Sequence, residues 1–209
     1  MGCEKYKPTY ILIALNVAIY IAGAIVGGNV IETNQTINLT WGQLNGAALY
    51  QGVLYQGAYW QLLTSIFIHA SIFHLVGNML FLLIFGLRGE EMFSLPEFLG
   101  IYLLGGLAGN FLYLQFGPLG IPGVGASGAI FSLFGACVIY DRRSMKQSIL
   151  GGLVFAFFLF FINVEPGVNL LAHLGGLVFG IVAGYLIASR RKPSHEKKEF
   201  KYRNSPLPF

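Results

Sequence analysis

The sequence predicts an all-α polytopic membrane protein, with six transmembrane helices, a short, sunken fourth helix and an interfacial first outer loop. Three observations predict this fold class. Of the 209 residues, 55% are hydrophobic and only 11% are charged, which is about half the charged fraction of a typical soluble domain. Six uncharged stretches approach the roughly 20 residues that a transmembrane helix needs. All 13 lysines and arginines fall on one side when the chain crosses a membrane six times.

The six predicted spans differ in length. The fourth and fifth are shorter than the others, and the fifth is rich in phenylalanine. The 28 glycines of the chain indicate close helix packing, because small residues let membrane helices approach one another. The spans are Thr9–Gly28, Leu62–Leu87, Phe98–Phe116, Val124–Tyr140, Ile149–Val164 and Asn169–Ser189.

The basic residues orient these spans. With six crossings, one side of the membrane holds the loops 29–61, 117–123 and 165–168, and none of these loops contains Lys or Arg. In membrane proteins the excess of Lys and Arg lies in cytoplasmic loops. We therefore expect a multi-pass integral membrane protein with both termini in the cytoplasm, located in the cell membrane if the host is a prokaryote.

The chain divides into a membrane domain and two short flanks. Residues 1–8 form a short cytoplasmic N-terminus, residues 9–189 the six-helix membrane domain, and residues 190–209 a basic cytoplasmic tail that we expect to be disordered. The charge of the tail favours an anchor at anionic lipid headgroups over a nucleic-acid site. The loop 29–61 is rich in aromatic residues, which favour the headgroup boundary, so short helices lying partly in the interface are expected there.

Polar side chains are found in the outer part of three predicted spans. Helical rise counted from the cytoplasmic ends of the second, fourth and sixth spans places them roughly 14 to 24 Å above the cytoplasmic boundary. The hydrocarbon core is about 30 Å thick, so these side chains share one level in its middle or outer part. Polar groups are costly in hydrocarbon and mark functional sites by default. The four residues are His74, Asn78, Ser127 and His173.

The fourth span has a broken start. The segment 117–125 contains two prolines and four glycines, which make a poor helix. We therefore expect the helix to begin near Ser127, below the outer surface, after a loop that dips into the membrane. Irregular backbone at this depth is tolerated where it lines a water-filled cavity, and a hydrolytic site needs such a cavity open to the outside.

The residue types at this level suit the hydrolysis of a peptide bond. A serine hydroxyl needs an adjacent base to become a nucleophile, and His173 is the candidate base for Ser127. The oxyanion of the tetrahedral intermediate needs preorganised donors. His74 and Asn78 are four residues apart and share one helical face, and the Ser127 N–H lies at a helix start. No Asp or Glu lies at this level to orient His173, so we expect a dyad instead of a triad.

Small residues predict that the fourth and sixth spans pack closely. The sixth carries Gly176, Gly180 and Gly184 at four-residue spacing, and His173 lies on the same face. The fourth carries Gly128, Ser132, Gly135 and Ala136. A seam of small residues lets two backbones approach closely, which would hold His173 near Ser127.

Neither a metal ion nor a cofactor is expected. The sequence has no His-Glu-x-x-His motif and no carboxylate near these histidines, so the spacing of metal ligands in a metalloprotease is missing. His69 precedes His74 by five residues and lies on a different helical face, so we expect a structural role for it.

Three elements resemble the rhomboid family of intramembrane serine proteases. They are Gly125-Ala-Ser127-Gly128, the stretch from His69 through His74 to Asn78, and Ala172-His173-Leu-Gly-Gly176 followed by Gly180. The resemblance covers all six spans and implies a Ser127–His173 dyad, an oxyanion site of His74, Asn78 and the Ser127 N–H, and a fifth span that gates lateral entry of substrate. It departs at Trp60-Gln61, where the family has Trp-Arg, and the uncharged Gln61 cannot make the ion pair that is usual in that loop.

The function that the resemblance implies is an intramembrane serine endopeptidase. Its partners would be the lipid bilayer and single-pass membrane proteins. These proteins would be cut in or near their transmembrane segments, on the outer side of the membrane. The preferred targets would be segments with small residues, because such a helix unwinds most easily. Two alternatives are weighed against this one. A transporter or channel should show internal repeats or a carboxylate relay, and neither is found. A rhomboid-like pseudoprotease typically lacks the serine or the histidine, and this chain has both. The sequence does not determine the oligomeric state.

Overall fold

The computed structural model describes residues 7–32, 44–45, 57–117, 122–145 and 170–191. Five long helices dominate this part of the chain: α1 (Pro8–Gly27), α4 (Ile72–Met92), α5 (Leu95–Phe116), α6 (Ser127–Met145) and α8 (Leu170–Arg190). All but α6 are long and apolar enough to cross a membrane, and α6 contains the shorter apolar stretch Ser127–Tyr140. The predicted all-α polytopic membrane fold is confirmed. The predicted fifth span, Ile149–Val164, lies outside the described residues, so the number six stays a prediction.

The prediction for the second span was wrong at both ends. Its first ten residues belong to α3 (Gln61–Thr64), to the 3-10 helix η2 (Ser65–Phe67) and to the connecting residues 68–71. Helix α4 begins only at Ile72, after Ser71, whose extended backbone and side-chain oxygen cap the helix by accepting the His74 N–H at 3.1 Å. Hydropathy cannot reveal this boundary, because the residues on both sides of the cap are apolar. The other end lies at Met92, because α4 continues through charged residues beyond Leu87.

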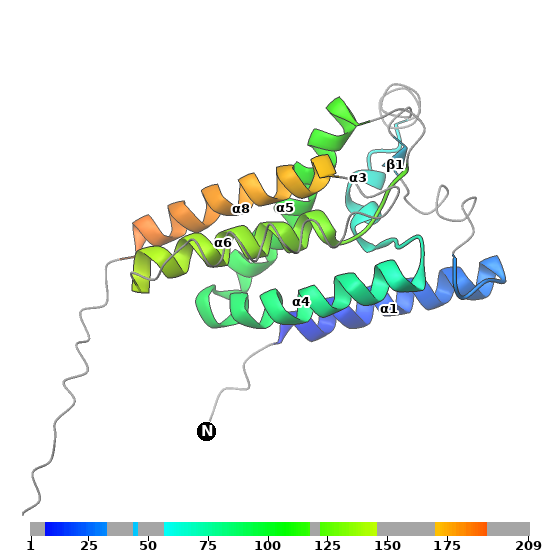
Figure 1. Cartoon of the computed structure of the whole chain (residues 1–209), viewed down its shortest axis with the longest axis horizontal. Coiled ribbons are helices and arrows are strands. Elements are labelled where there is room, and N and C mark those ends of the chain that lie inside the picture. Colours follow the sequence, from blue (N-terminus) through cyan, green and yellow to red (C-terminus); the bar gives the residue numbers. More distant parts are fainter. Residues whose placement is uncertain (1–6, 33–43, 46–56, 118–121, 146–169, 192–209) are drawn as a thin grey trace, which may run out of the picture.

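Four of the helices pack side by side in the order α1, α4, α6 and α8 (Figure 1). Helix α6 lies against α8 on one side and contacts α4 on the other, while α1 packs along α4. Helix α5 packs against both α6 and α8. Consequently the three predicted site segments, which begin α4, α6 and α8, come from neighbouring helices.

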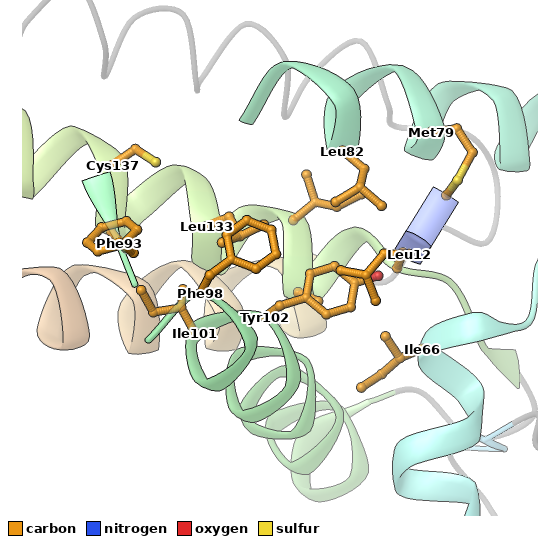
Figure 2. Close-up of a cluster of buried hydrophobic side chains, with 14 of the residues drawn as sticks. Leu12, Ile66, Met79, Leu82, Phe93, Phe98, Ile101, Tyr102, Leu133 and Cys137 are labelled. Carbon is orange, nitrogen blue, oxygen red and sulfur yellow. The ribbon is translucent and has the colours of Figure 1, made fainter. Parts of the chain in front are cut away.

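Helix α5 supplies much of the hydrophobic core. Figure 2 shows side chains of α1, α4, α5, α6 and η2 converging on this region. Tyr102 and Phe98 of α5 are almost completely buried there, and Leu82 of α4 and Leu133 of α6 are fully buried. The core therefore includes η2, which precedes α4 in the chain, and packs it against the membrane helices.

The outer faces of the helices are apolar and exposed. Large hydrophobic side chains such as Ile25 (76% exposed), Phe73 (72%) and Phe111 (61%) point away from the bundle. So much exposed apolar surface is unusual for a soluble protein, and in a membrane protein it is the face that contacts lipid. Tyr59 and Trp60, at the end of the first outer loop, are also more than half exposed. The interfacial location of this loop stays a prediction, because much of it lies outside the described residues.

Two short strands join the outer loops, which the sequence did not predict. Strand β1 (Leu44–Asn45) pairs with β2 (Pro122–Gly123) in an antiparallel register, with Leu44 opposite Gly123 and Asn45 opposite Pro122. Strand β2 lies four residues before Ser127. The pairing therefore connects the first outer loop to the segment that leads into the site.

Arg191, which follows the last residue of α8, contacts three other elements of the bundle. Its guanidinium donates to the Met92 carbonyl at 2.6 Å and to the Tyr140 hydroxyl at 2.8 Å. It also pairs with Glu97, whose carboxylate accepts the Ser94 N–H at 2.7 Å in the capping box of α5. One side chain thus links the end of α8 to α6 and to the α4–α5 turn. The rest of the predicted tail, residues 192–209, lies outside the described residues.

The start of α1 is anchored to the end of α4. The Glu90 carboxylate accepts the Thr9 N–H at 2.8 Å, and this N–H has no acceptor within its own helix because it belongs to the first turn. The fully buried Thr9 side chain fills the space above Gly86, where a Cβ atom would come within 2.5 Å of the Thr9 Oγ1.

We expect Glu90→Ala to lower the free energy of unfolding by about 1 kcal/mol, because the Thr9 N–H loses its capping acceptor. Glu91→Ala is the matched control, since the neighbouring Glu91 is exposed and pairs with Arg88 at 2.5 Å, a surface contact that contributes little. Thermal unfolding in one detergent compares the two variants. Equal decreases in Tm would contradict the anchoring role of Glu90.

Candidate active site

Ser127 is the first residue of α6, as the sequence predicted for the helix start. The turn before it depends on Gly125, whose φ of 114° is rarely adopted by residues with a side chain. The Gly125 N–H donates to the Ser65 carbonyl of η2 at 2.9 Å. Ser127 is partly exposed, while Ala126 beside it is fully buried. The serine therefore stands at the rim of the core, at the positive end of the α6 dipole.

His74 and Asn78 lie on α4 beside this turn. A Cβ atom on Gly125 would come within 2.8 Å of the His74 Nε2 and within 3.8 Å of the Asn78 Nδ2. Asn78 is buried, and its amide donates to the His74 carbonyl at 2.9 Å. The structure thus brings both side chains against the backbone that precedes Ser127, and any side chain at position 125 would displace the imidazole.

His173 lies on the first turn of α8 and is 3% exposed. Its ring stacks on that of Phe131 of α6, with centroids 4.5 Å apart and an interplanar angle of 22°. The preceding Ala172 carbonyl oxygen is 3.1 Å from the position of a Cβ atom on Gly128. These contacts place His173 beside the start of α6.

Close backbone packing joins α6 to α8 along their length. A Cβ atom on Gly176 would meet the Gly128 carbonyl, and one on Gly180 would meet the Ser132 carbonyl. Near the other end of the seam, a Cβ atom on Gly184 would approach the Ala136 oxygen to 2.6 Å. No side chain larger than hydrogen fits at these three positions of α8, so the two helices are as close as their backbones allow.

His69 is buried behind His74. Its ring is 1% exposed and meets the His74 ring edge-on, with centroids 5.1 Å apart. It lies in the turn between η2 and α4, outside the helix in which the sequence placed it. Trp60, by contrast, is 57% exposed and immediately precedes α3, which begins at Gln61.

Three residues near the site were missed in the sequence. Phe131 follows Ser127 by four residues, so the helical period alone could have put it on the same face. Ser65 and Asn110 have no such signal, because their contacts join segments far apart in the chain. In the described part of the chain, no group of three or more His, Cys, Asp or Glu side chains could hold a metal ion.

The arrangement defines a class of protein: a polytopic membrane protein with a serine, a histidine and two further polar side chains in the first two turns of three helices. A model of the Rhomboid domain family matches residues 56–190, and this match includes all four side chains. The chain therefore belongs to the rhomboid family.

Individual relatives agree with this assignment. The chain is 32% identical to RHOMBOID-like protein 1 of Arabidopsis thaliana, over 77% of this chain and 42% of the relative. It is 33% identical to Rhomboid protease GluP of Bacillus subtilis, over 86% and 35%, and 32% identical to Rhomboid-like protease 3 of Toxoplasma gondii, over 58% and 49%. The chain thus spans about half or less of the length of these curated relatives.

Proposed function

We propose that the protein is an intramembrane serine endopeptidase that uses a Ser127–His173 dyad. The observation that carries the proposal is the packing around the start of α6, where Gly125 contacts His74 and Gly128 contacts the residue before His173. This packing supports the proposal, because it brings together the helices that carry the proposed nucleophile, base and donors. Relatives named rhomboid proteases support the same reaction class.

In the proposed reaction, the Ser127 Oγ attacks the carbonyl carbon of the scissile peptide bond. His173 accepts the hydroxyl proton as general base, and the carbonyl π electrons move to the oxygen to form a tetrahedral oxyanion. When this intermediate collapses, the C–N bond breaks and His173 returns the proton to the leaving amine. Water then attacks the resulting ester by the same route and regenerates Ser127.

The oxyanion is stabilised by donors that are already in place. The Ser127 N–H at the first turn of α6, the His74 imidazole and the Asn78 amide are the candidates. Such donors act most strongly where water is largely excluded. In the proposed dyad, the stacking of Phe131 on His173 helps to hold the plane of the imidazole.

The proposed substrates are single-pass membrane proteins, cut in or near their transmembrane segments. A peptide bond inside a helix is hidden by its own hydrogen bonds, so a segment with small or helix-weakening residues is the preferred target. The proposed site residues lie in the first two turns of α4, α6 and α8, and these three helices start at the same end of the bundle (Figure 1). With both termini in the cytoplasm, cleavage takes place on the outer side of the membrane. Residues 9–189 form the proposed protease domain, and the basic tail 190–209 binds anionic lipid.

The test is cleavage of a generic single-pass membrane substrate by purified protein in mild detergent. We expect the wild type to cleave it and to be labelled covalently at Ser127 by a fluorophosphonate, because this reagent reacts with activated serines. Ser127→Ala should lose both signals. Equal cleavage by Ser127→Ala would contradict the role of Ser127. Wild-type protein that neither cleaves nor reacts with the fluorophosphonate would indicate a binding protein without catalysis.

A further inference from the structure

A buried asparagine on α5 connects that helix to α3 and η2. Asn110 is 8% exposed, and its amide nitrogen donates to the Leu62 carbonyl at 2.7 Å and to the Ser65 Oγ at 2.9 Å. These acceptors lie 48 and 45 residues earlier in the chain, on α3 and η2. A carbonyl oxygen only accepts hydrogen bonds, so the contact with Leu62 fixes which end of the amide faces the loop.

A second contact holds η2 against the same face of α5. The Ile66 side chain packs into the space beside Gly106, where a Cβ atom would come within 2.6 Å of the Ile66 Cδ1. Gly106 and Asn110 are four residues apart and share one helical face. The position of η2 is thus set by an apolar contact and by the two hydrogen bonds of Asn110.

The segment held in this way reaches the turn before Ser127. The Ser65 side chain accepts from Asn110, while the Ser65 carbonyl accepts the Gly125 N–H at 2.9 Å. Gly125, in turn, lies against His74 and Asn78. A continuous series of contacts therefore runs from α5, which contributes none of the four site residues, through η2 to the proposed oxyanion site.

We propose that Asn110 is a positioning residue for the oxyanion site. Its hydrogen bonds go to Leu62 and Ser65, and it acts by holding Ser65 so that the Gly125 turn presents the Ser127 N–H beside His74. The inference rests on the proposed function. Displacement of about 1 Å by a distant substitution can lower a rate about 100-fold, so a shift of the turn affects the chemical step and leaves substrate binding intact.

The experiment compares two asparagine-to-leucine variants. Asn110→Leu keeps the approximate shape of the side chain and removes its donors. Asn16→Leu is the matched control, because Asn16 is also buried but its amide nitrogen donates to Leu12 of its own helix, α1, at 2.8 Å. Among the described residues, its side chain has one further polar interaction, with Tyr102 of the core and not with a residue of η2 or the Gly125 turn. We expect Asn110→Leu to lower kcat roughly 10- to 100-fold at unchanged KM and to slow fluorophosphonate labelling in parallel. Asn16→Leu should lower Tm without this loss of kcat.

A measurement independent of activity accompanies the kinetics. The Gly125 amide is hydrogen-bonded to Ser65, so its hydrogen exchange should become at least roughly tenfold faster in Asn110→Leu and stay unchanged in Asn16→Leu. Unchanged exchange, or kcat losses that are equal in the two variants, would overturn the inference and leave the proposed protease function standing. Failure of the wild type to cleave or to be labelled would contradict that function instead, and the exchange data would still test the contact.

A second variant covers the case in which Asn110→Leu does not fold. Ser65→Ala removes one acceptor of Asn110 and keeps the carbonyl that holds Gly125. Because one hydrogen bond contributes about 1 kcal/mol, we expect about a fivefold lower kcat at unchanged KM. A kcat equal to that of the wild type would overturn the inference.

Discussion

Replacing either Ser127 or His173 with alanine is expected to lower kcat for peptide-bond cleavage by roughly four to six orders of magnitude. The serine provides the nucleophile and the histidine its base, so neither retains its function without the other. The double variant should therefore be almost as active as either single variant. Initial rates on one membrane substrate, measured with enough enzyme to detect the residual activity, give all three values.

The control for this experiment lies on the same helix as His173. Ser189 is exposed, and its hydroxyl donates to the Tyr185 carbonyl of α8 at 2.6 Å. Ser189→Ala should keep wild-type kcat. If the losses of Ser127→Ala and His173→Ala multiply in the double variant, the two side chains act independently and the proposed dyad is wrong. The comparison thus tests the pairing as well as each residue.

Replacing Gly180 with alanine is expected to have the second-largest effect, a loss of both stability and Ser127 reactivity. The added Cβ atom would lie 2.7 Å from the Ser132 Cα, and it would also meet the Ser132 carbonyl. These are backbone atoms of a helix and cannot rotate away, so α8 has to move as a unit. Overpacking of this kind costs about 1 to 3 kcal/mol. The movement also carries His173, about 10 Å along the same helix, away from Ser127.

Gly100 provides the matched substitution. It lies within α5, and a Cβ atom there would meet nothing within 4 Å. Gly100→Ala should raise the free energy of unfolding by about 0.4 to 1 kcal/mol, because the unfolded chain loses conformational freedom. Gly180→Ala should lower Tm and slow fluorophosphonate labelling of Ser127. A Gly180→Ala variant with wild-type Tm and labelling rate would contradict the backbone contact between α6 and α8.

Hydropathy located the helices to different degrees. The first and sixth predicted spans begin and end within one residue of α1 and α8, and the third ends with α5 at Phe116. In each of these cases polar, charged or helix-breaking residues lie at the ends of the apolar stretch. The second span fails because its start is set by a hydrogen bond from the His74 N–H to Ser71 inside an apolar run. Transfer of apolar surface from water is insensitive to such a bond.

For the candidate site too, the sequence revealed some residues and missed others. His74, Asn78, Ser127 and His173 were found because a polar side chain in a predicted transmembrane helix contradicts its surroundings. Phe131 was missed because an apolar aromatic residue matches the apolar surroundings of a transmembrane helix, although it stacks on His173. Their chemical roles stay a prediction until the Ser127 and His173 variants are measured.

The sequence by itself determined the membrane-protein class, the positions of most helices and the polar side chains that gather at one level. These features are local, because hydropathy, helical period and glycine spacing each act within a few turns of one chain segment. Only the tertiary structure decided that the start of the predicted second span folds as α3 and η2 and that Asn110 connects them to the turn before Ser127. A hydrogen bond between residues 45 positions apart leaves no local pattern, since it forms only when packing has brought the two segments together.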